Sequence, residues 1–215
     1  RKIGLGLMGF ADLLYQLRIP YNTAQARQLG ARIMQEVQTW SDDESFVLGI
    51  ERGRYPAAPE TDFYRNACRL TVAPTGTISM IADTSSGIEP TFALVWTKSN
   101  ILDGKTLFYT NKYFEAVAHE EGFYSEDLMN HLANGGALGS RADVPEWVRS
   151  VFVTSMDIDA SDHVLMQAAF QEYCDSGISK TINFPNHASM NDVREAYMLA
   201  WRHRCKGITV YRAGS

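Results

Sequence analysis

The stretch that decides the fold is Cys68–Ser79, CRLTVAPTGTIS. Its first five residues are apolar and β-branched enough to predict a buried strand, which Pro74 ends. Residues 77–83 then predict a helical turn. A strand that leads through a glycine-containing turn into a helix is typical of α/β folds with parallel strands, so the stretch favours that class.

The turn between this strand and the helix predicts an anion site. The first backbone N–H groups of a helix have no partner inside it, and the helix dipole places partial positive charge at that end. Gly76 lets a phosphate approach the backbone without a Cβ in the way, and Thr75, Thr77 and Ser79 add hydroxyl groups. No Lys follows, so the turn is not a Walker loop. A Thr-capped helix without a ligand is the equally weighted alternative.

Strands and helices alternate along the rest of the chain, with Pro and Gly between them. The predicted strands are residues 1–9, 68–72, 179–184 and 208–211. The predicted helices are residues 10–17, 41–51, 107–122, 125–133 and 161–175, one from a cap at Asn22 or Thr23 to Trp40, a short one with Pro145 at its first position, and one opened by the N-cap pair Ser189 and Asp192, with Val193, Ala196, Tyr197, Ala200 and Trp201 on one face. This order predicts parallel strand pairing.

A second glycine-rich stretch, Gly4–Gly9 (GLGLMG), matches the dinucleotide-binding pattern GxGxxG. Such a site needs a second strand that ends in Asp or Glu roughly 20 residues further on. The corresponding residues 18–25 contain Pro20 and no such strand. Packing of a strand end against a helix is therefore the favoured interpretation of these glycines, and cofactor binding is the alternative.

Three further polar residues are candidates for the same pocket. The loop 84–90 follows the predicted helical turn, and its Glu89 is expected to orient the loop through a hydrogen bond rather than to act in catalysis. Lys180 and Asn183 belong to the strand 179–184, where either residue could face a ligand. Exposure to solvent is nevertheless the more common fate of a lone lysine.

Composition narrows the class of protein. The chain has 215 residues and a net charge of −5, which gives no support to nucleic-acid binding as a main role. The sequence contains no run of 18 apolar residues, so no membrane-spanning helix is predicted. Cys68, Cys174 and Cys205 form no CxxC pair and the five histidines show no metal-ligand spacing, so no metal site is predicted. An intracellular, reduced and cytoplasmic protein is expected.

Six stretches of the chain together carry a resemblance to a known family. They are Arg1–Leu14, Ala73–Ser79, Thr84–Pro90, His163–Gln171, Ser179–Asn183 and Lys206–Arg212. In this order they resemble the large catalytic chains of ribonucleotide reductases, and within them the vitamin B12-dependent class. The resemblance implies the ten-stranded α/β barrel of that family, of which residues 1–215 would form the C-terminal part.

The resemblance also implies a function. Members of this family reduce ribonucleoside di- or triphosphates at the ribose 2′-carbon by thiyl-radical chemistry. The segment that matches Pro74, Thr75, Gly76, Thr77 and Ile78 holds the substrate phosphates, in agreement with the anion site inferred from the turn. A thioredoxin-like protein or another dithiol supplies electrons, and the cofactor of this class is adenosylcobalamin.

None of the family's catalytic residues is expected in this chain. The radical cysteine of the family lies in an Asn-x-Cys-x-Glu loop, whereas Asn66-Ala67-Cys68-Arg69 is not followed by Glu. The radical loop, the first redox cysteine and most cobalamin contacts are expected upstream of Arg1, and a redox tail beyond Ser215. The chain alone is therefore expected to be inactive and to need an N-terminal portion as its partner.

Few residues decide the reductase class and distinguish it from two alternative functions. Reductases that import their radical use adjacent tyrosines near the last barrel strand, whereas Val210-Tyr211-Arg212 offers a single tyrosine, which favours adenosylcobalamin. One alternative is a non-catalytic module that completes a partner's barrel. The other is an NAD(P)-dependent hydroxyacid dehydrogenase, which Gly4–Gly9 suggests but which leaves the other five stretches unexplained.

Overall fold

The computed structural model describes residues 1–101 and 105–215, and it has the mixed α/β architecture that the sequence predicts. The strands are β1 (Lys2–Leu5), β2 (Cys68–Leu70), β3 (Val95–Ile101), β4 (Lys105–Thr110), β5 (Thr181–Phe184) and β6 (Thr209–Arg212). The helices are α1 (Phe10–Gln16), α2 (Ala24–Arg52), α3 (Gly76–Ile81), α4 (Lys112–Glu120), α5 (Glu126–Ala133), α6 (Glu146–Val151), α7 (Ala160–Gln171) and α8 (Met190–Arg202), with a 3-10 turn at Leu138–Ser140.

Four strands follow one another side by side in the order β1, β2, β5, β6. β1 pairs with β2 and β5 pairs with β6, in both cases parallel. Between these pairs, a parallel bridge joins Val72 to Ile178. Ser176 N–H donates to the Leu70 carbonyl at 3.0 Å, and Ser179 N–H donates to the Val72 carbonyl at 2.8 Å. The predicted parallel pairing is therefore confirmed.

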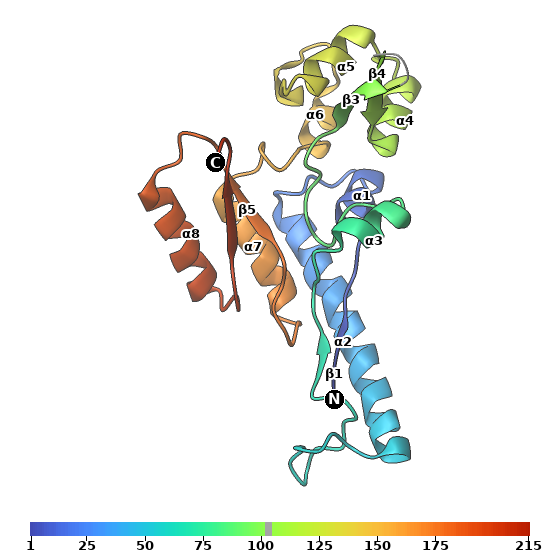
Figure 1. Ribbon diagram of the computed structural model, residues 1–215, viewed down its shortest axis with the longest axis vertical. Coiled ribbons are helices and arrows are strands. Elements are labelled where there is room, and N and C mark those ends of the chain that lie inside the picture. The colour runs from blue at the N-terminus through green and yellow to red at the C-terminus, as the bar shows by residue number, and fades with distance from the viewer. Residues whose placement is uncertain (102–104) are drawn as a thin grey trace.

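Helices α1, α2 and α7 lie close together (Figure 1), and the buried cluster to which they contribute is mostly aliphatic with an aromatic pair from α1 and α7. Phe10 and Phe170 are fully buried and meet edge to face, with ring centroids 5.0 Å apart. Helix α2 approaches them at Gly30, where an added Cβ would come within 2.5 Å of the Phe170 ring. A glycine inside a long helix is therefore explained by close packing.

One predicted helix is partly wrong. Residues 107–122 were expected to form one helix, but β4 extends to Thr110 and pairs antiparallel with β3. The helix begins only after Asn111, whose side chain accepts hydrogen bonds from the N–H groups of Tyr113 and Phe114, both at 3.1 Å. Cross-strand pairing and this N-cap together override the helical pattern of residues 107–110.

The antiparallel pair β3–β4 and the helices α4–α6 form a second core. The chain enters and leaves this part of the structure at neighbouring positions. Phe114, Leu128 and Val148 are fully buried in it, and Phe152 is 1% exposed. At the entry, Ser155 N–H donates to the Thr91 carbonyl at 2.9 Å. The chain thus leaves the strand layer after Thr91 and returns to it at Ser155, and the backbone segments at these two residues lie side by side.

Other boundaries differ from the predicted ones for local reasons. α2 is one continuous helix from the Thr23 cap to Arg52, where two helical stretches were predicted. Pro145 is the N-cap of α6 rather than its first residue, with an extended ψ of 142°. The Ser189–Asp192 capping box is confirmed. None of the helices in the described ranges is long and apolar enough to span a membrane.

The predicted apolar face of α8 is only partly buried. Ala196 and Ala200 are each 4% exposed and pack against β5 and its surroundings. Tyr197 and Trp201, on the same predicted face, are 46% and 72% exposed. The buried stripe of this helix is therefore narrower than the sequence pattern indicated.

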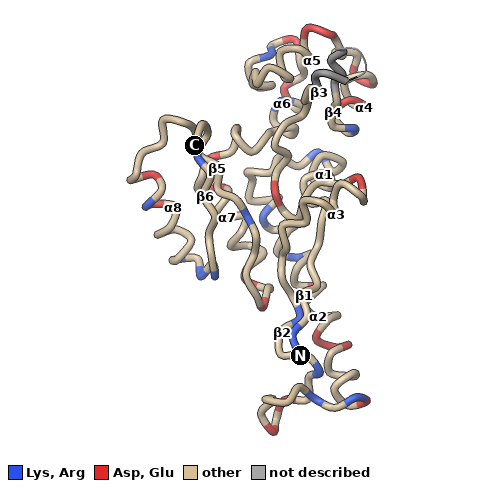
Figure 2. The backbone as a smooth tube through the Cα atoms, in the orientation of Figure 1, with Lys and Arg blue, Asp and Glu red and all other residues tan. Residues whose placement is uncertain are grey.

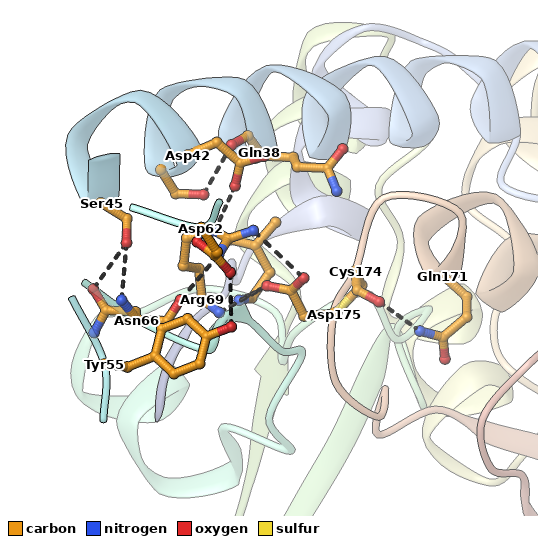
Figure 3. Close-up of polar contacts among 12 residues, drawn as sticks. Gln38, Asp42, Ser45, Tyr55, Asp62, Asn66, Arg69, Gln171, Cys174 and Asp175 are labelled. Carbon is orange, nitrogen blue, oxygen red and sulfur yellow. Dashed lines mark hydrogen bonds and ion pairs between the residues drawn. The ribbon is translucent and has the colours of Figure 1, made fainter. Parts of the chain in front are cut away.

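A polar cluster holds α2, β2 and the loop after α7 together at the amino ends of the strands (Figure 3). Asp175 accepts hydrogen bonds from the N–H groups of Arg69 and Leu70, at 2.7 and 3.0 Å. The Arg69 guanidinium contacts Asp42 on α2, and it lies 4.8 Å from the Tyr64 ring centroid. The Asp175 carboxylate therefore satisfies two main-chain donors at the start of β2.

Replacing Asp175 by Ala should lower the free energy of unfolding by about 2 kcal/mol, because two part-buried N–H groups lose their acceptor. Chemical denaturation monitored by circular dichroism measures the loss. Asp143→Ala is the control, since Asp143 pairs with Arg141 at the exposed surface and should cost below about 0.5 kcal/mol. Equal losses in the two variants would contradict the assignment of Asp175 as a structural acceptor.

Candidate functional site

A cavity of about 1070 Å³ lies among the loops that follow β1 and β2 and the strands β5 and β6. Alternate residues of β5, Thr181 and Asn183, and the consecutive residues Thr209–Tyr211 of β6 line one side. Trp96 and Tyr109 of the hairpin line another side, with their rings stacked 6.1 Å apart. Segments distant in the sequence therefore meet at one site.

The predicted anion turn reaches this cavity through Gly76, while Pro74, Thr75, Thr77 and Ile78 lie beside it. Gly76 has open space around it, since an added Cβ would meet no atom within 4 Å. Pro74, Thr77 and Ile78 are exposed. The first-turn N–H groups of α3 are therefore next to open space at the cavity edge.

Thr75 does not cap α3 in the predicted way. It is the N-cap residue, but it has left-handed backbone dihedrals (φ 54°, ψ 20°) and its side chain makes no cap hydrogen bond. Its hydroxyl instead accepts a hydrogen bond from Gly87 N–H at 2.9 Å. Thr75 thus joins the anion turn to the loop 84–90.

The loop 84–90 is fixed from several sides. The Asp12 carboxylate accepts hydrogen bonds from the Ser85 N–H at 2.7 Å and the Thr84 hydroxyl at 3.0 Å. The Ser79 and Ser86 hydroxyls lie 2.8 Å apart. Asp12, which is 5% exposed and lines the cavity, was not singled out from the sequence. Its only signal was an acidic residue in the first turn of a helix.

The glycines of the GxGxxG stretch serve close packing, but Gly4 and Gly6 pack against the neighbouring strand segment at Thr71 rather than against a helix. An added Cβ at Gly6 would lie 2.3 Å from the Thr71 carbonyl oxygen, and one at Gly4 would lie 2.5 Å from the Thr71 side chain. Gly9 has φ 80° and donates its N–H to the Ser85 carbonyl at 2.8 Å. These glycines let β1 and α1 approach β2 and the loop 84–90.

Lys180 is buried, contrary to the solvated position that is usual for a lone lysine. Its ammonium donates to the Glu89 carboxylate at 2.7 Å and to His163 Nδ1 at 2.8 Å. Glu89 also accepts from the Thr181 N–H at 2.6 Å, so it orients the loop as expected. Asn183, by contrast, lines the cavity directly.

His163 is held in its neutral form. Burial, together with the Lys180 ammonium, lowers the pKa of His163 to about 3, and a hydrogen bond with the Ser155 carbonyl opposes this shift. Burial also lowers the pKa of Lys180, while Glu89 raises it. A neutral imidazole can accept from Lys180 through Nδ1 and donate to Ser155 through Nε2.

The cysteines and metal-binding side chains do not extend the site. None of Cys68, Cys174 and Cys205 lines the cavity, and burial raises the pKa of the Cys174 and Cys205 thiols. Within residues 1–101 and 105–215, no group of three or more His, Cys, Asp or Glu side chains is placed to hold a metal ion. The side chains that line the cavity thus carry hydroxyl, amide, aromatic and carboxylate groups, together with the ammonium of Lys112.

Comparisons with known proteins give the chain a family context. The family model described as "Ribonucleotide reductase, barrel domain" matches residues 1–63 and 58–211. The chain is 47% identical over 99% of its length to a vitamin B12-dependent ribonucleoside-diphosphate reductase of Thermoplasma acidophilum. It is 42% identical over its whole length to an enzyme of the same name from Mycobacterium tuberculosis. It spans only 28% and 32% of these two relatives.

A solved structure confirms the fold at full coverage of this chain. The class Id ribonucleotide reductase alpha subunit of Actinobacillus ureae superposes with a TM-score of 0.85 at 25% sequence identity. The match covers 100% of this chain and 39% of the subunit. The predicted barrel type is thereby supported for the part of the barrel that this chain forms.

The low pKa of His163 predicts a pH dependence of stability. Because the folded pKa lies below the unfolded value of about 6.5, the unfolded chain binds the extra proton between these values. Stability should therefore fall as pH decreases from about 6.5 toward 3, by at most about 1.4 kcal/mol per pH unit. Denaturation curves of the protein and of His163→Gln measure this slope.

The variant lacks the titrating ring, so its stability should depend less on pH in this window. His203→Gln is the control, because His203 is exposed and its loss should leave the slope unchanged. The same slope in all three proteins would show that His163 titrates normally in the folded state.

Proposed function

The chain belongs to the ribonucleotide reductase family through its barrel domain, and we propose that it works as part of an enzyme that reduces ribonucleotides to deoxyribonucleotides by thiyl-radical chemistry. The observation that carries the proposal is the cavity at which the anion turn, the loop 84–90, β5 and β6 meet. These are the segments through which the sequence resembles the family. The names of the most similar curated relatives support the same activity.

Pro74, Thr75, Gly76, Thr77 and Ile78 are the proposed phosphate-binding residues. The N–H groups of Gly76, Thr77 and Ile78 belong to the first turn of α3 and need acceptors from outside the helix. The open space at Gly76 and its position at the cavity wall support phosphate binding there. Of the two expected substrates, the names of the relatives favour a ribonucleoside diphosphate over a triphosphate.

Adenosylcobalamin is the proposed cofactor, since the relatives are named as vitamin B12-dependent. When bound, this group supplies the radical from which the thiyl radical is generated. Tyr211 lines the cavity and its chain neighbours are Val210 and Arg212, so β6 offers no adjacent pair of tyrosines for a radical relay. That arrangement fits a radical made inside the barrel, with most cofactor contacts supplied by another portion of the enzyme.

The proposed partners are an N-terminal portion that carries an Asn-x-Cys-x-Glu loop and a thioredoxin-like or dithiol reductant. Exposed apolar residues on β1, with Ile3 at 53% and Leu5 at 49%, support association with a further portion. Val210 and Tyr211 on β6, 36% and 39% exposed, support it from the other side of the strand row. A non-catalytic module that completes a partner's barrel shares these features, and activity separates the two.

The chain assembled with such an N-terminal portion should form deoxyribonucleotide when adenosylcobalamin and a dithiol are present. Product is measured by chromatography, with either portion alone and a cobalamin-free mixture as controls. Activity that requires both portions and the cofactor is the expected result. An assembled but inactive pair favours the structural module, and activity without cobalamin excludes the proposed class.

Gly76→Ala tests the phosphate turn, because the added Cβ meets nothing in the folded protein but occupies space that a bound phosphate needs. Thermal stability should be retained or slightly raised, since Ala favours a helix by about 1 kcal/mol over Gly. The KM for the nucleotide should rise by about tenfold or more in the assembled enzyme, a loss of roughly 1.4 kcal/mol.

Gly139→Ala is the matched control, as its added Cβ also meets nothing and Gly139 does not line the cavity. It should leave KM unchanged. An unchanged KM in Gly76→Ala as well would contradict phosphate binding at this turn.

A further inference from the structure

Lys180 is the most deeply buried charged group next to the cavity, and its side chain has no exposed surface. An ammonium group has three N–H donors, and each finds an acceptor here. They are the Glu89 carboxylate at 2.7 Å, His163 Nδ1 at 2.8 Å and the Thr181 carbonyl. The ammonium therefore cannot contact a bound ligand directly, and any effect on the ligand must pass through its partners.

Glu89 is the partner that reaches the cavity. Its side chain is 25% exposed and lines the cavity wall. One carboxylate oxygen is held by Lys180 and the other by the Thr181 N–H, so the group is fixed in place. Glu89 lies two residues beyond Gly87, whose N–H binds the Thr75 hydroxyl. The loop that carries the Glu89 carboxylate is thus tied to the proposed phosphate turn by this hydrogen bond.

Glu89 differs from the other charged residues that line the cavity in how its charge is compensated. Figure 2 shows acidic and basic residues interspersed along the chain, so individual pairs set the local charge. Asp83 is paired with the exposed Lys112 at 2.7 Å, and its own side chain is 85% exposed, so water screens it. Asp12 binds a main-chain N–H and a hydroxyl. Glu89 alone has a buried lysine behind it.

We infer that Lys180 is a positioning residue that fixes the Glu89 carboxylate at the cavity wall and cancels its charge, so that an anionic nucleotide can bind beside it. The inference rests on the proposed function, because it concerns the binding of a ribonucleotide in this cavity. An uncompensated carboxylate in a poorly solvated wall would repel the phosphates. Removing Lys180 should therefore weaken nucleotide binding through the charge of Glu89.

The test compares ADP binding to the assembled enzyme and to three variants by isothermal titration calorimetry at low and high ionic strength. Lys180→Met keeps an unbranched side chain of similar length but removes the charge, and should weaken binding by about tenfold at low salt. The loss should shrink at high salt. Lys180→Met combined with Glu89→Gln restores a neutral wall and should bind within about threefold of the parent enzyme.

Glu89→Gln alone leaves the charge of Lys180 uncancelled, so it should bind ADP about threefold or more tightly than the parent at low salt. This variant keeps the inference testable even where Lys180→Met folds poorly, because binding equal to or weaker than that of the parent would contradict it. Arg32→Met, which removes an exposed positive charge on α2 away from the cavity, is the control for net charge and should not change binding. In turnover assays, Lys180→Met should raise KM and leave kcat largely unchanged.

Two further results would overturn the inference. A double variant that binds as weakly as Lys180→Met would show that the lysine acts through packing rather than charge. Unchanged binding in a folded Lys180→Met variant would show that it does not act on the ligand. A parent enzyme that fails to bind ADP would instead overturn the proposed function, and the inference with it.

Discussion

The structure depends on the main-chain pairing between β2 and residues 176–179. Two N–H groups, from Ser176 and Ser179, join segments that lie about a hundred residues apart in the chain. Closing such a long loop costs more conformational entropy than forming a local turn does. The Arg69–Asp175 contacts at the start of β2 add polar stabilisation to the same junction. The loop 84–90 and β5 become neighbours only because this junction forms.

The geometry at the cavity depends on this contact between the loop 84–90 and β5, and on a strained backbone conformation at Thr75. Thr75 is β-branched, yet it has positive φ, a conformation that costs free energy for such a residue. The hydrogen bond from Gly87 and the contacts of Asp12 with the loop 84–90 hold the turn against this cost. The first turn of α3 is therefore fixed before any ligand arrives, which lowers the entropic cost of binding.

Local signals in the sequence predicted most helices and strands. The features that the sequence did not predict depend on contacts between residues far apart in the chain. The Thr23 cap and the Ser189–Asp192 pair involve residues within three positions of each other, so they could be predicted. The helix predicted over 107–122 was wrong only in its first residues, because pairing with β3 decides the state of residues 107–110. The burial of Lys180 follows from Glu89, 91 residues away, which no local pattern reveals. The turn between β2 and α3 was predictable, but the hydrogen bond from Gly87 N–H to the Thr75 hydroxyl was not.

The hydrogen bond from Ser155 N–H to the Thr91 carbonyl has a consequence for how the chain can change in evolution. The chain leaves the strand layer after Thr91 and returns to it at Ser155, and apart from Tyr15 of α1 the buried residues of the second core all belong to residues 92–154. Insertions or deletions within them can therefore be absorbed without moving β2 or β5. Because Trp96 and Tyr109 reach the cavity from this part, such changes would reshape one wall of the cavity while the turn at Gly76 stays where it is.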